Sequence, residues 1–424
     1  MGQAGIAFEP LWTAEAPLDE AEPGPLPTDA DVVVVGAGYA GLMAGHEVAT
    51  RGKHALVLDA GPLGWGASSR NGGMVIPELK AGPTAMAAKH GELGRRLYAA
   101  VDEAFDLVEE LCGPGGIDAD YARTGQLLLA HHRRAVPDLH ALEADMAAAG
   151  DQVHLVPRGE LCDEVGSEAF AAGLVIERTG GLHPARFHRG LLQRTRAAGA
   201  ELHGHTRATA TARRSGGGFT VATERGEVQA GEVVVLTNAY ADSLLPELAR
   251  RVLPIGSFII ATEPLEPDVA AALIPHRRML VDTKQLLLYW RLAPGNRLVF
   301  GGRRSLASTS VPAAAAFLQA ELLRVHPQLE GVAITHAWGG EVAMTFDRLP
   351  HAGTIDGVRY ATGCNGSGVA LNTWLGRAVG AWACGDEPPA FAELPHPRIP
   401  LSGLRRAWLP LVGEVTRVRD RLVR

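Results

Sequence analysis

Short apolar runs separated by glycine and polar residues open the ordered part of the chain. Residues 31–36, D-V-V-V-V-G, form a β-branched run that is typical of a buried parallel strand. Apolar residues at helical spacing follow over 41–50, and a second buried strand is predicted at 54–59. Residues 1–28 are rich in proline, alanine and acids, which predicts an irregular arm. Strand, helix and strand within thirty residues predict a βαβ unit.

Helical and strand-like segments alternate over the rest of the chain. Helices are predicted at 93–112, 134–149, 184–198 and 312–325, and the first two are assigned to a cap. Strands are predicted at 201–205, 219–223, 233–237, 258–262, 286–292 and 297–301. The pattern predicts an α/β fold in which a Rossmann-like domain is joined to a second domain with a mainly antiparallel sheet.

Composition narrows the class of protein. The chain has 424 residues, 46% hydrophobic and 21% charged, with a formal net charge of −7, and no basic block indicates a nucleic-acid partner. Four widely spaced cysteines give neither a metal-ligand pattern nor a disulfide framework. No apolar run reaches the roughly 18 residues of a membrane span, and the first residues lack the features of a signal peptide. We therefore expect a cytoplasmic enzyme without a metal.

A glycine fingerprint lies between the first predicted strand and helix. Gly36-Ala37-Gly38-Tyr39-Ala40-Gly41 matches G-x-G-x-x-G, in which the first glycine permits a tight turn, the second admits a pyrophosphate and the third allows close helix packing. Asp59, followed by Ala60, ends the second strand, where a carboxylate can accept hydrogen bonds from ribose hydroxyls. The sequence therefore predicts a dinucleotide site.

Two further glycine-rich loops accompany this fingerprint. The loop at 64–73 places glycines around hydroxyl, guanidinium and amide groups, which suits a pyrophosphate and a flat ring, and its candidate contacts are Gly66, Ala67, Ser68, Arg70, Asn71, Gly72 and Gly73. The loop at 363–371 precedes an apolar helix whose free N–H groups would stabilise negative charge, and its candidates are Gly366, Ser367, Gly368 and Val369. Together the loops favour a flavin over a nicotinamide.

Sequence motifs along nearly the whole chain carry a family resemblance. They are G-W-G-A-S-S-R-N-G-G at 64–73, V-V-V-L-T-N-A-Y at 233–240 with Asn238, the stretch 253–264, Y-W-R at 289–291, F-G-G-R at 300–303, W-G-G at 338–340, R-L-P-H at 348–351 and the loop at 363–371. The chain resembles the D-amino-acid oxidase superfamily of flavoproteins, most of all its gamma-glutamylputrescine oxidase branch.

The resemblance implies FAD as cofactor and oxidation of a C–N bond in a small-molecule amine or amino acid, with O₂ or another electron acceptor. It implies an FAD-binding domain at 28–85, 150–245 and 332–388, a substrate and cap domain at 86–149 and 246–331, and a C-terminal tail at 389–424. Tyr289, Arg291 and His351 are the candidate substrate-side residues. For Arg291 a carboxylate clamp and a structural salt bridge remain equal alternatives, and for His351 a structural role stays open.

Departures from the family pattern leave the substrate and acceptor open. Ser69, Met74, Cys364 and Ser367 stand where the branch tends to have Gly, Gln, Tyr and His. Sarcosine-oxidase-like relatives carry an oxygen-activating lysine near the position of Val299, and the cysteine that attaches their flavin has no counterpart at 342–344. Non-covalent FAD is therefore expected. Alternatives are a D-amino-acid, glycine or sarcosine-type oxidase or dehydrogenase, a biosynthetic amine oxidase, an NAD(P) dehydrogenase and a non-catalytic flavin-fold subunit.

Overall fold

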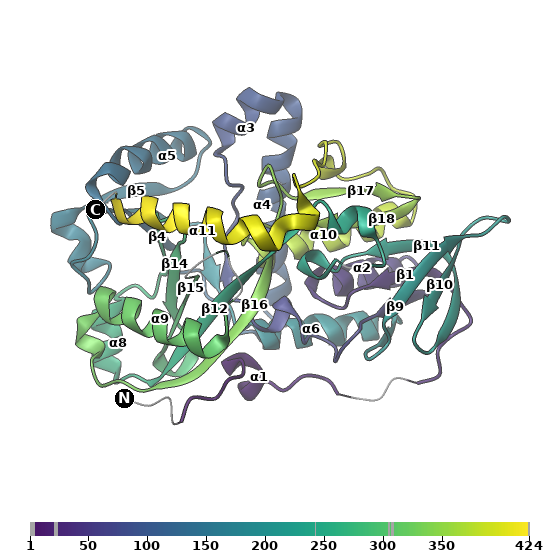
Figure 1. Ribbon diagram of the computed structural model, residues 1–424, viewed down its shortest axis with the longest axis horizontal. Coiled ribbons are helices and arrows are strands. Elements are labelled where there is room, and N and C mark those ends of the chain that lie inside the picture. The colour runs from purple at the N-terminus through teal and green to yellow at the C-terminus, as the bar shows by residue number, and fades with distance from the viewer. Residues whose placement is uncertain (1–4, 21–23, 242, 304–305, 307–308, 423–424) are drawn as a thin grey trace.

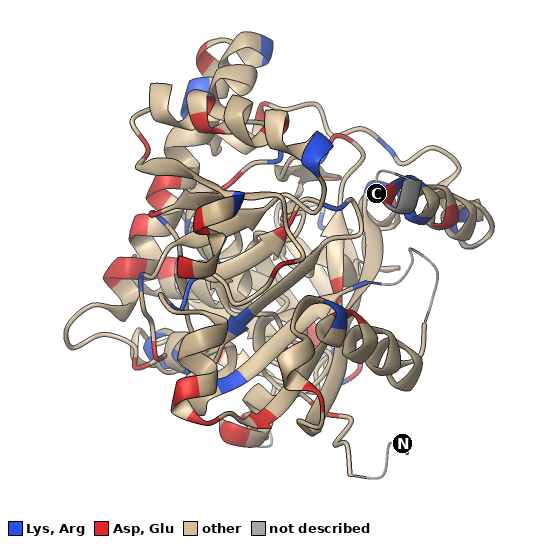
Figure 2. Cartoon of the chain, turned by 90° about the vertical axis from the view of Figure 1, so that its left-hand side faces the viewer, with Lys and Arg blue, Asp and Glu red and all other residues tan. Residues whose placement is uncertain are grey.

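The computed structural model describes residues 5–20, 24–241, 243–303, 306 and 309–422. Its strands gather into two large sheets, one toward each end of the long axis of the molecule (Figure 1). Figure 2 shows lysines and arginines interspersed with aspartates and glutamates on the side that it presents. None of the helices in the described part of the chain is both long and apolar enough to cross a membrane.

The first sheet has the strand order β17-β18-β11-β1-β2-β8, and it runs parallel from β18 to β8. A hairpin of β9 and β10 extends from β11. The strands are β1 (Asp29–Val35), β2 (Ala55–Leu58), β8 (Glu201–His203), β9 (Ala208–Arg213), β10 (Phe219–Thr223), β11 (Gly226–Val235), β17 (His351–Ile355) and β18 (Val358–Thr362). Val32 and Val34 of β1 pack on one face and Val33 and Val35 on the other, as a β-branched run predicts for a parallel strand covered on both sides.

The second sheet has the order β16-β12-β15-β14-β13-β4-β6-β5, and every neighbouring pair except β13 and β4 is antiparallel. Its strands are β4 (Gln126–Leu129), β5 (Val153–Pro157), β6 (Ala172–Ile176), β12 (Leu253–Pro264), β13 (Met279–Asp282), β14 (Leu288–Leu292), β15 (Arg297–Gly302) and β16 (Ile334–Met344). Strands β3 (Met74–Val75) and β7 (Gly180–Gly181) form a small separate pair. The predicted fold class, a Rossmann-like domain with a mainly antiparallel partner, is confirmed.

Three segments pair or pack differently from what their predicted domains implied. Strands β5 and β6 lie in the second sheet through pairing with β4, although 150–245 was assigned to the nucleotide domain. Strand β16 pairs with β12 and also belongs to the second sheet. Helix α4 (Glu92–Cys112) was assigned to a cap but packs into the core beside α10. Sheet membership depends on partners far away in the sequence, which local periodicity does not reveal.

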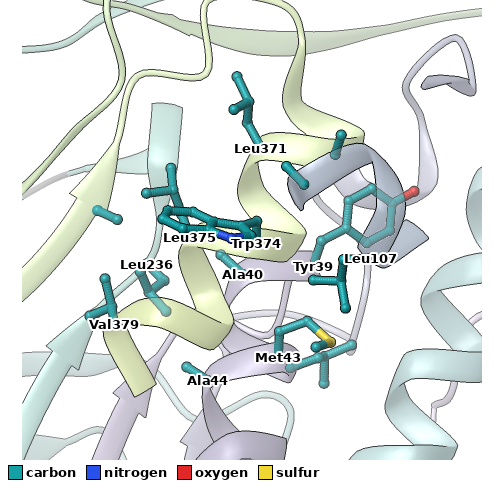
Figure 3. Close-up of a cluster of buried hydrophobic side chains, with 14 of the residues drawn as sticks. Tyr39, Ala40, Met43, Ala44, Leu107, Leu236, Leu371, Trp374, Leu375 and Val379 are labelled. Atoms are coloured by element: carbon teal, nitrogen blue, oxygen red, sulfur yellow. The ribbon is translucent and has the colours of Figure 1, made fainter. Parts of the chain in front are cut away.

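Eleven helices are assigned in the described chain. They are α1 (Leu11–Glu15), α2 (Tyr39–Thr50), α3 (Pro83–His90), α4, α5 (Val136–Ala148), α6 (Pro184–Ala197), α7 (Pro246–Ala249), α8 (Pro267–Leu273), α9 (Val311–Val325), α10 (Gly368–Ala383) and α11 (Arg405–Leu422). Helix α10 lies directly against α2, and Figure 3 shows Leu375 and Trp374 beside Ala40. A Cβ atom at Gly376 would lie 2.1 Å from the backbone oxygen of Ala40, so glycine allows this close approach.

Both ends of the chain form ordered contacts with the two-sheet body. In the arm, Trp12 of α1 is fully buried and donates its indole N–H to the backbone oxygen of Asn71 at 2.8 Å. Near the other end, α11 crosses the middle of the molecule (Figure 1). Its Asp420 carboxylate accepts the backbone N–H groups of Gln285 and Leu286 at 3.2 and 3.0 Å. The arm and the tail therefore hold loops that belong to the body of the fold.

Candidate active site

A cavity of about 680 Å³ lies between the carboxyl ends of the first sheet and one face of the second sheet. Most of the predicted site residues line it, namely Gly36, Gly38, Tyr39, Ala40, Asp59, Ala60, Gly66, Ala67, Ser68, Arg70, Asn71, Gly72, Asn238, Tyr289, Gly366, Ser367, Gly368 and Val369. Gly41, Gly73, Arg291 and His351 lie outside its wall. The cavity therefore brings together loops that are hundreds of residues apart in the sequence.

The glycine fingerprint forms a tight turn at the end of β1. Gly36 has φ +104°, and a Cβ atom there would lie 3.0 Å from the carbonyl oxygen of Leu236. A Cβ atom at Gly41 would lie only 1.6 Å from the carbonyl oxygen of Gly36, so the turn and the start of α2 require glycine at both positions. Helix α2 begins at Tyr39, whose N–H donates to the Ser68 hydroxyl at 3.0 Å, and this end of the helix lies at the cavity wall.

Asp59 holds this turn together at the end of β2. One carboxylate oxygen accepts the backbone N–H of Ala37 at 2.8 Å. The other accepts the backbone N–H of Gly61 at 3.1 Å and the indole N–H of Trp65 at 2.9 Å. Since a carboxylate offers about four acceptor positions, Asp59 retains capacity for a ligand hydroxyl.

The loop at 64–73 is fixed by its own side chains. Arg70 donates to the backbone oxygens of Gly66 and Gly339, each at 3.1 Å, and to that of Trp65, and burial lowers the pKa of its guanidinium. Asn71 donates to the backbone oxygens of Ala67 and Ser68 and accepts the N–H of Gly73. Side-chain bonds to the backbone of this kind preserve one loop conformation and leave little of these groups for direct ligand contact.

The loop at 363–371 is held from the neighbouring strand end by Asn238. The Asn238 Oδ1 accepts the N–H of Gly363 at 3.1 Å, and its Nδ2 lies 3.5 Å from the Cys364 sulfur. Helix α10 then begins at Gly368, and the hydroxyl of Ser367, the residue before it, donates to the Glu78 carboxylate at 3.0 Å. The N-terminus of α10 thus lies at the cavity wall, as the sequence predicted.

These features fit a bound dinucleotide with a flat ring. Two helix N-termini, those of α2 and α10, meet the same cavity, and each favours negative charge in a ligand. The turn at Gly36 and Gly38 keeps side chains away from the first helix end; a Cβ atom at Gly38 would lie 2.8 Å from the Ser68 hydroxyl. The described residues contain no cluster of His, Cys, Asp and Glu that could hold a metal ion.

Comparison with known proteins identifies the ligand. A model of the DAO family, described as FAD dependent oxidoreductase, matches residues 31–382. The chain belongs to this family. It is 33% identical over 367 residues to a probable oxidoreductase OrdL of Haemophilus influenzae, covering 84% of each chain. It is 31% identical to gamma-glutamylputrescine oxidoreductase of Escherichia coli, covering 92% of this chain and 93% of that protein.

Solved structures of the same fold agree with this assignment. Glycine oxidase from Geobacillus kaustophilus superposes with a TM-score of 0.76 at 22% identity, covering 88% of this chain and all of that one. The protein is therefore an FAD-dependent oxidoreductase of the DAO family that acts on amines or amino acids.

The three predicted substrate-side residues occupy different places around this flavoprotein's cavity. Tyr289 lines it, with its hydroxyl 3.2 Å from the Ser257 hydroxyl and its pKa raised by burial. The ring packs between Gly72 and Gly301, where Cβ atoms would lie 2.9 and 2.3 Å from it. Tyr289 is thus held by close packing at the junction between the loop at 64–73 and the second sheet.

Arg291 lies behind the cavity wall, where its guanidinium contacts backbone oxygens and an aromatic ring. It donates to the backbone oxygens of Gly72 at 2.8 Å and Leu182 at 2.5 Å, and its guanidinium lies 5.3 Å from the centre of the Trp12 ring. Burial lowers its pKa to about 10, so it stays charged at neutral pH. This placement favours neither a clamp for a substrate carboxylate nor a structural salt bridge, because the hydrogen-bond partners are backbone carbonyl groups and not a carboxylate.

His351 is also buried behind the cavity. Its Nε2 lies 3.0 Å from the Asp347 carboxylate, and its ring stacks on that of His396 with a centroid distance of 4.0 Å. Burial first, and then the nearby His351 and Arg251, lower the pKa of His396 to about 3. The pair supports the strand from which the flavin loop emerges, which corresponds to the structural alternative for His351.

Sequence reasoning missed several polar residues of the wall, among them Arg303, Ser257, Gln126 and Glu78. Arg303 directly follows β15, and Ser257 lies within β12. Gln126 is the first residue of β4, and Glu78 lies in the segment after β3. Arg303 closes the F-G-G-R motif at 300–303, so a signal was present but was not assigned to a role. Gln126 begins an otherwise apolar strand, Q-L-L-L, and nothing local distinguishes it.

Proposed function

We propose that this enzyme oxidises the amine end of a gamma-glutamylated amine, with FAD held non-covalently. Bound FAD supplies the hydride acceptor for the carbon next to nitrogen, and the resulting imine is hydrolysed by water to a carbonyl compound and an amine. The observation that carries the substrate proposal is the similarity to gamma-glutamylputrescine oxidoreductase, which extends over 92% of the chain.

The chain's own residues position the substrate and exclude water. Part of the wall opposite the nucleotide turn is apolar, and its side chains there include Leu128, Ile259, Leu287 and Val342. An apolar wall of this kind favours the neutral form of an amine and keeps bulk water from the reacting carbon. Tyr289, whose hydroxyl bonds with Ser257, is proposed to orient the amine end.

Non-covalent attachment is supported by the residues near the flavin loops. Val342 lines the cavity at the place where relatives with covalent flavin carry a cysteine, and Cys364 is the cysteine that the described wall contains. Denaturing the purified protein with acid tests this point. Flavin that remains in the supernatant supports the proposal, whereas flavin that precipitates with the polypeptide overturns it.

Anaerobic reduction of the flavin spectrum tests the substrate class. The holoenzyme is mixed with gamma-glutamylputrescine, N-methyl amino acids or D-amino acids, and the loss of visible flavin absorbance is followed. Fast bleaching by gamma-glutamylputrescine alone supports the proposal, whereas fast bleaching by a small amino acid replaces it with amino-acid oxidation. Readmission of air then assigns the acceptor, because rapid return of colour indicates O₂ and slow return indicates another acceptor.

A further inference from the structure

The cations of the cavity wall differ in the contacts that the described residues make with them. Arg70 bonds to backbone oxygens, Lys80 pairs with Glu78 and Arg207 lies 3.9 Å from Glu224, while Arg405 acts electrostatically on Glu341. For Arg303, the described part of the chain offers no hydrogen bond and no ion pair, and only Tyr289 acts on it electrostatically. Burial lowers the pKa of its guanidinium, because a charge is held there without compensation.

The register of the second sheet gives Arg303 polar neighbours on the cavity side. In the antiparallel pairing of β12 with β15, Phe258 is opposite Gly302, so the register brings Ser257 opposite Arg303. In the next pair, Tyr289 is opposite Gly301, and the side chains of alternate residues share one face. Arg303, Ser257 and Tyr289 therefore form one polar group on the cavity face of the second sheet.

A guanidinium that faces the cavity without a partner in the described chain can bind an anion, and a planar carboxylate matches its geometry with two parallel hydrogen bonds. The flavin pyrophosphate is a poor partner, because the helix N-terminus that favours it follows β1 of the other sheet. Gln126 on the same sheet is 3% exposed, lines the cavity and has an Oε1 without a partner in the described chain. A polar ligand end thus fits this wall better than a hydrocarbon end.

We propose that Arg303, beside the Tyr289 and Ser257 hydroxyls, binds a carboxylate at the end of the substrate remote from the oxidised amine. The inference rests on the proposed function and deepens it. The enzyme recognises the acid of the gamma-glutamyl group, so that an acylated amine without a carboxylate enters the cavity but is held weakly.

Steady-state kinetics of the holoenzyme with three amines tests the role of Arg303. The amines are gamma-glutamylputrescine, N-acetylputrescine, which keeps the amide but has no carboxylate, and putrescine. The Arg303→Gln variant is expected to raise KM for gamma-glutamylputrescine by roughly 10- to 100-fold, the range of one charged bidentate contact, with little change in kcat. Its kcat/KM for N-acetylputrescine stays within about twofold of wild type, since no contact is lost. Arg303→Lys restores part of the affinity.

Arg297→Gln is the matched control, because Arg297 lies on the same strand but donates to Thr262 and Thr335 away from the cavity. It leaves the preference for the carboxylate unchanged. Equal losses on gamma-glutamylputrescine and N-acetylputrescine in Arg303→Gln, or loss of bound flavin in that variant, would overturn the inference, because Arg303 would then serve the cofactor or the fold.

Calorimetric binding separates this inference from the proposed function. The probe is gamma-glutamylbutylamide, which has the gamma-glutamyl carboxylate but lacks the terminal amine that the proposed reaction oxidises, and N-butylacetamide is its uncharged counterpart. Binding of the first to wild type, lost in Arg303→Gln, supports the carboxylate site even if no amine reduces the flavin. Reduction by gamma-glutamylputrescine with equal binding of the probe to both proteins leaves the proposed function standing and refutes the role of Arg303.

Discussion

The nucleotide end of the cavity consists mainly of backbone, whereas the substrate end consists mainly of side chains. At the first end, the glycine turn and two helix N-termini line the cavity, and side chains such as Asp59 bond to the protein itself. At the second end, Arg303 and the Gln126 Oε1 have no hydrogen-bond partner in the described part of the chain. The first end therefore tolerates little change in shape, while the second can change specificity through single side chains without loss of the fold.

The largest effect is expected from a substitution in the glycine turn, which tests whether the first end tolerates a change in shape. Gly41→Ala places a methyl group 1.6 Å from the carbonyl oxygen of Gly36, which forces α2 away from the turn. We expect a loss of about 3 kcal/mol in the free energy of unfolding of this lobe and no retained flavin. The ratio of flavin to protein absorbance and a urea unfolding curve measure both effects.

Gly159→Ala is the control for this substitution. A Cβ atom at Gly159 meets nothing within 4 Å, and its φ is negative, so flavin content and stability should match wild type. Full flavin occupancy in Gly41→Ala would show that the turn is not constrained by the close contact and would refute the contrast between the two ends.

Acid should weaken the nucleotide lobe through His396, which lies behind the flavin loop. Its folded pKa of about 3 is below the ordinary value near 6.5, so the unfolded chain binds a proton first as the pH falls. Stability that is complete above pH 6.5 is therefore lost progressively toward pH 3, by roughly 2 kcal/mol between pH 7 and pH 4.5. His396→Gln, which keeps an acceptor for the Tyr360 hydroxyl, should flatten this decline.

Chemical unfolding at several pH values measures this dependence. The same substitution at His154, which is exposed on β5, should leave the slope unchanged. If His396→Gln lost stability with acid as steeply as wild type, the decline would have to come from other groups, such as the buried His326, whose pKa burial lowers to about 4.

The same difference between the ends explains what could be predicted from the sequence. The glycine turn, β1, α2 and β2 follow one another in the chain, so local spacing predicted them within two residues. The two later flavin loops were also predicted, because each is a short glycine-rich segment before a helix or after a strand. Sites made from backbone depend on local sequence, and a local pattern describes them well.

The substrate end depends on which strands become neighbours. Gln126, Ser257 and Arg303 share a face only because β4, β12 and β15 belong to one sheet, and the strands β5, β6 and β16, which were assigned to the nucleotide domain, pair in that sheet as well. Arg291 was a candidate because of its charge, yet its N–H groups are used by backbone oxygens. Neither fact is encoded in the spacing of residues along the chain.

A smaller effect is expected where a side chain fixes a flavin loop. Asn238→Gly keeps the backbone conformation, φ +47°, but leaves the N–H of Gly363 without its acceptor. The loss of this hydrogen bond costs about 1 kcal/mol, and flavin affinity should fall by roughly 5- to 10-fold. Titration of the apoprotein with FAD measures it. Asn296→Gly, the same change at φ +58° outside the cavity, should leave flavin affinity intact.

The smallest expected effect concerns the support of the substrate end by the C-terminal helix. Asp420 of α11 accepts two backbone N–H groups of the loop that leads to Leu287, a residue of the cavity wall. Asp420→Ala removes both acceptors at a solvent-accessible site, so the cost should stay below about 1 kcal/mol and KM should rise about twofold with unchanged flavin content. Glu414→Ala is the control, because Glu414 pairs only with Arg417 on the same exposed helix. A change in flavin content in Asp420→Ala would mean that α11 supports both ends of the cavity, and the two ends would then not be independent.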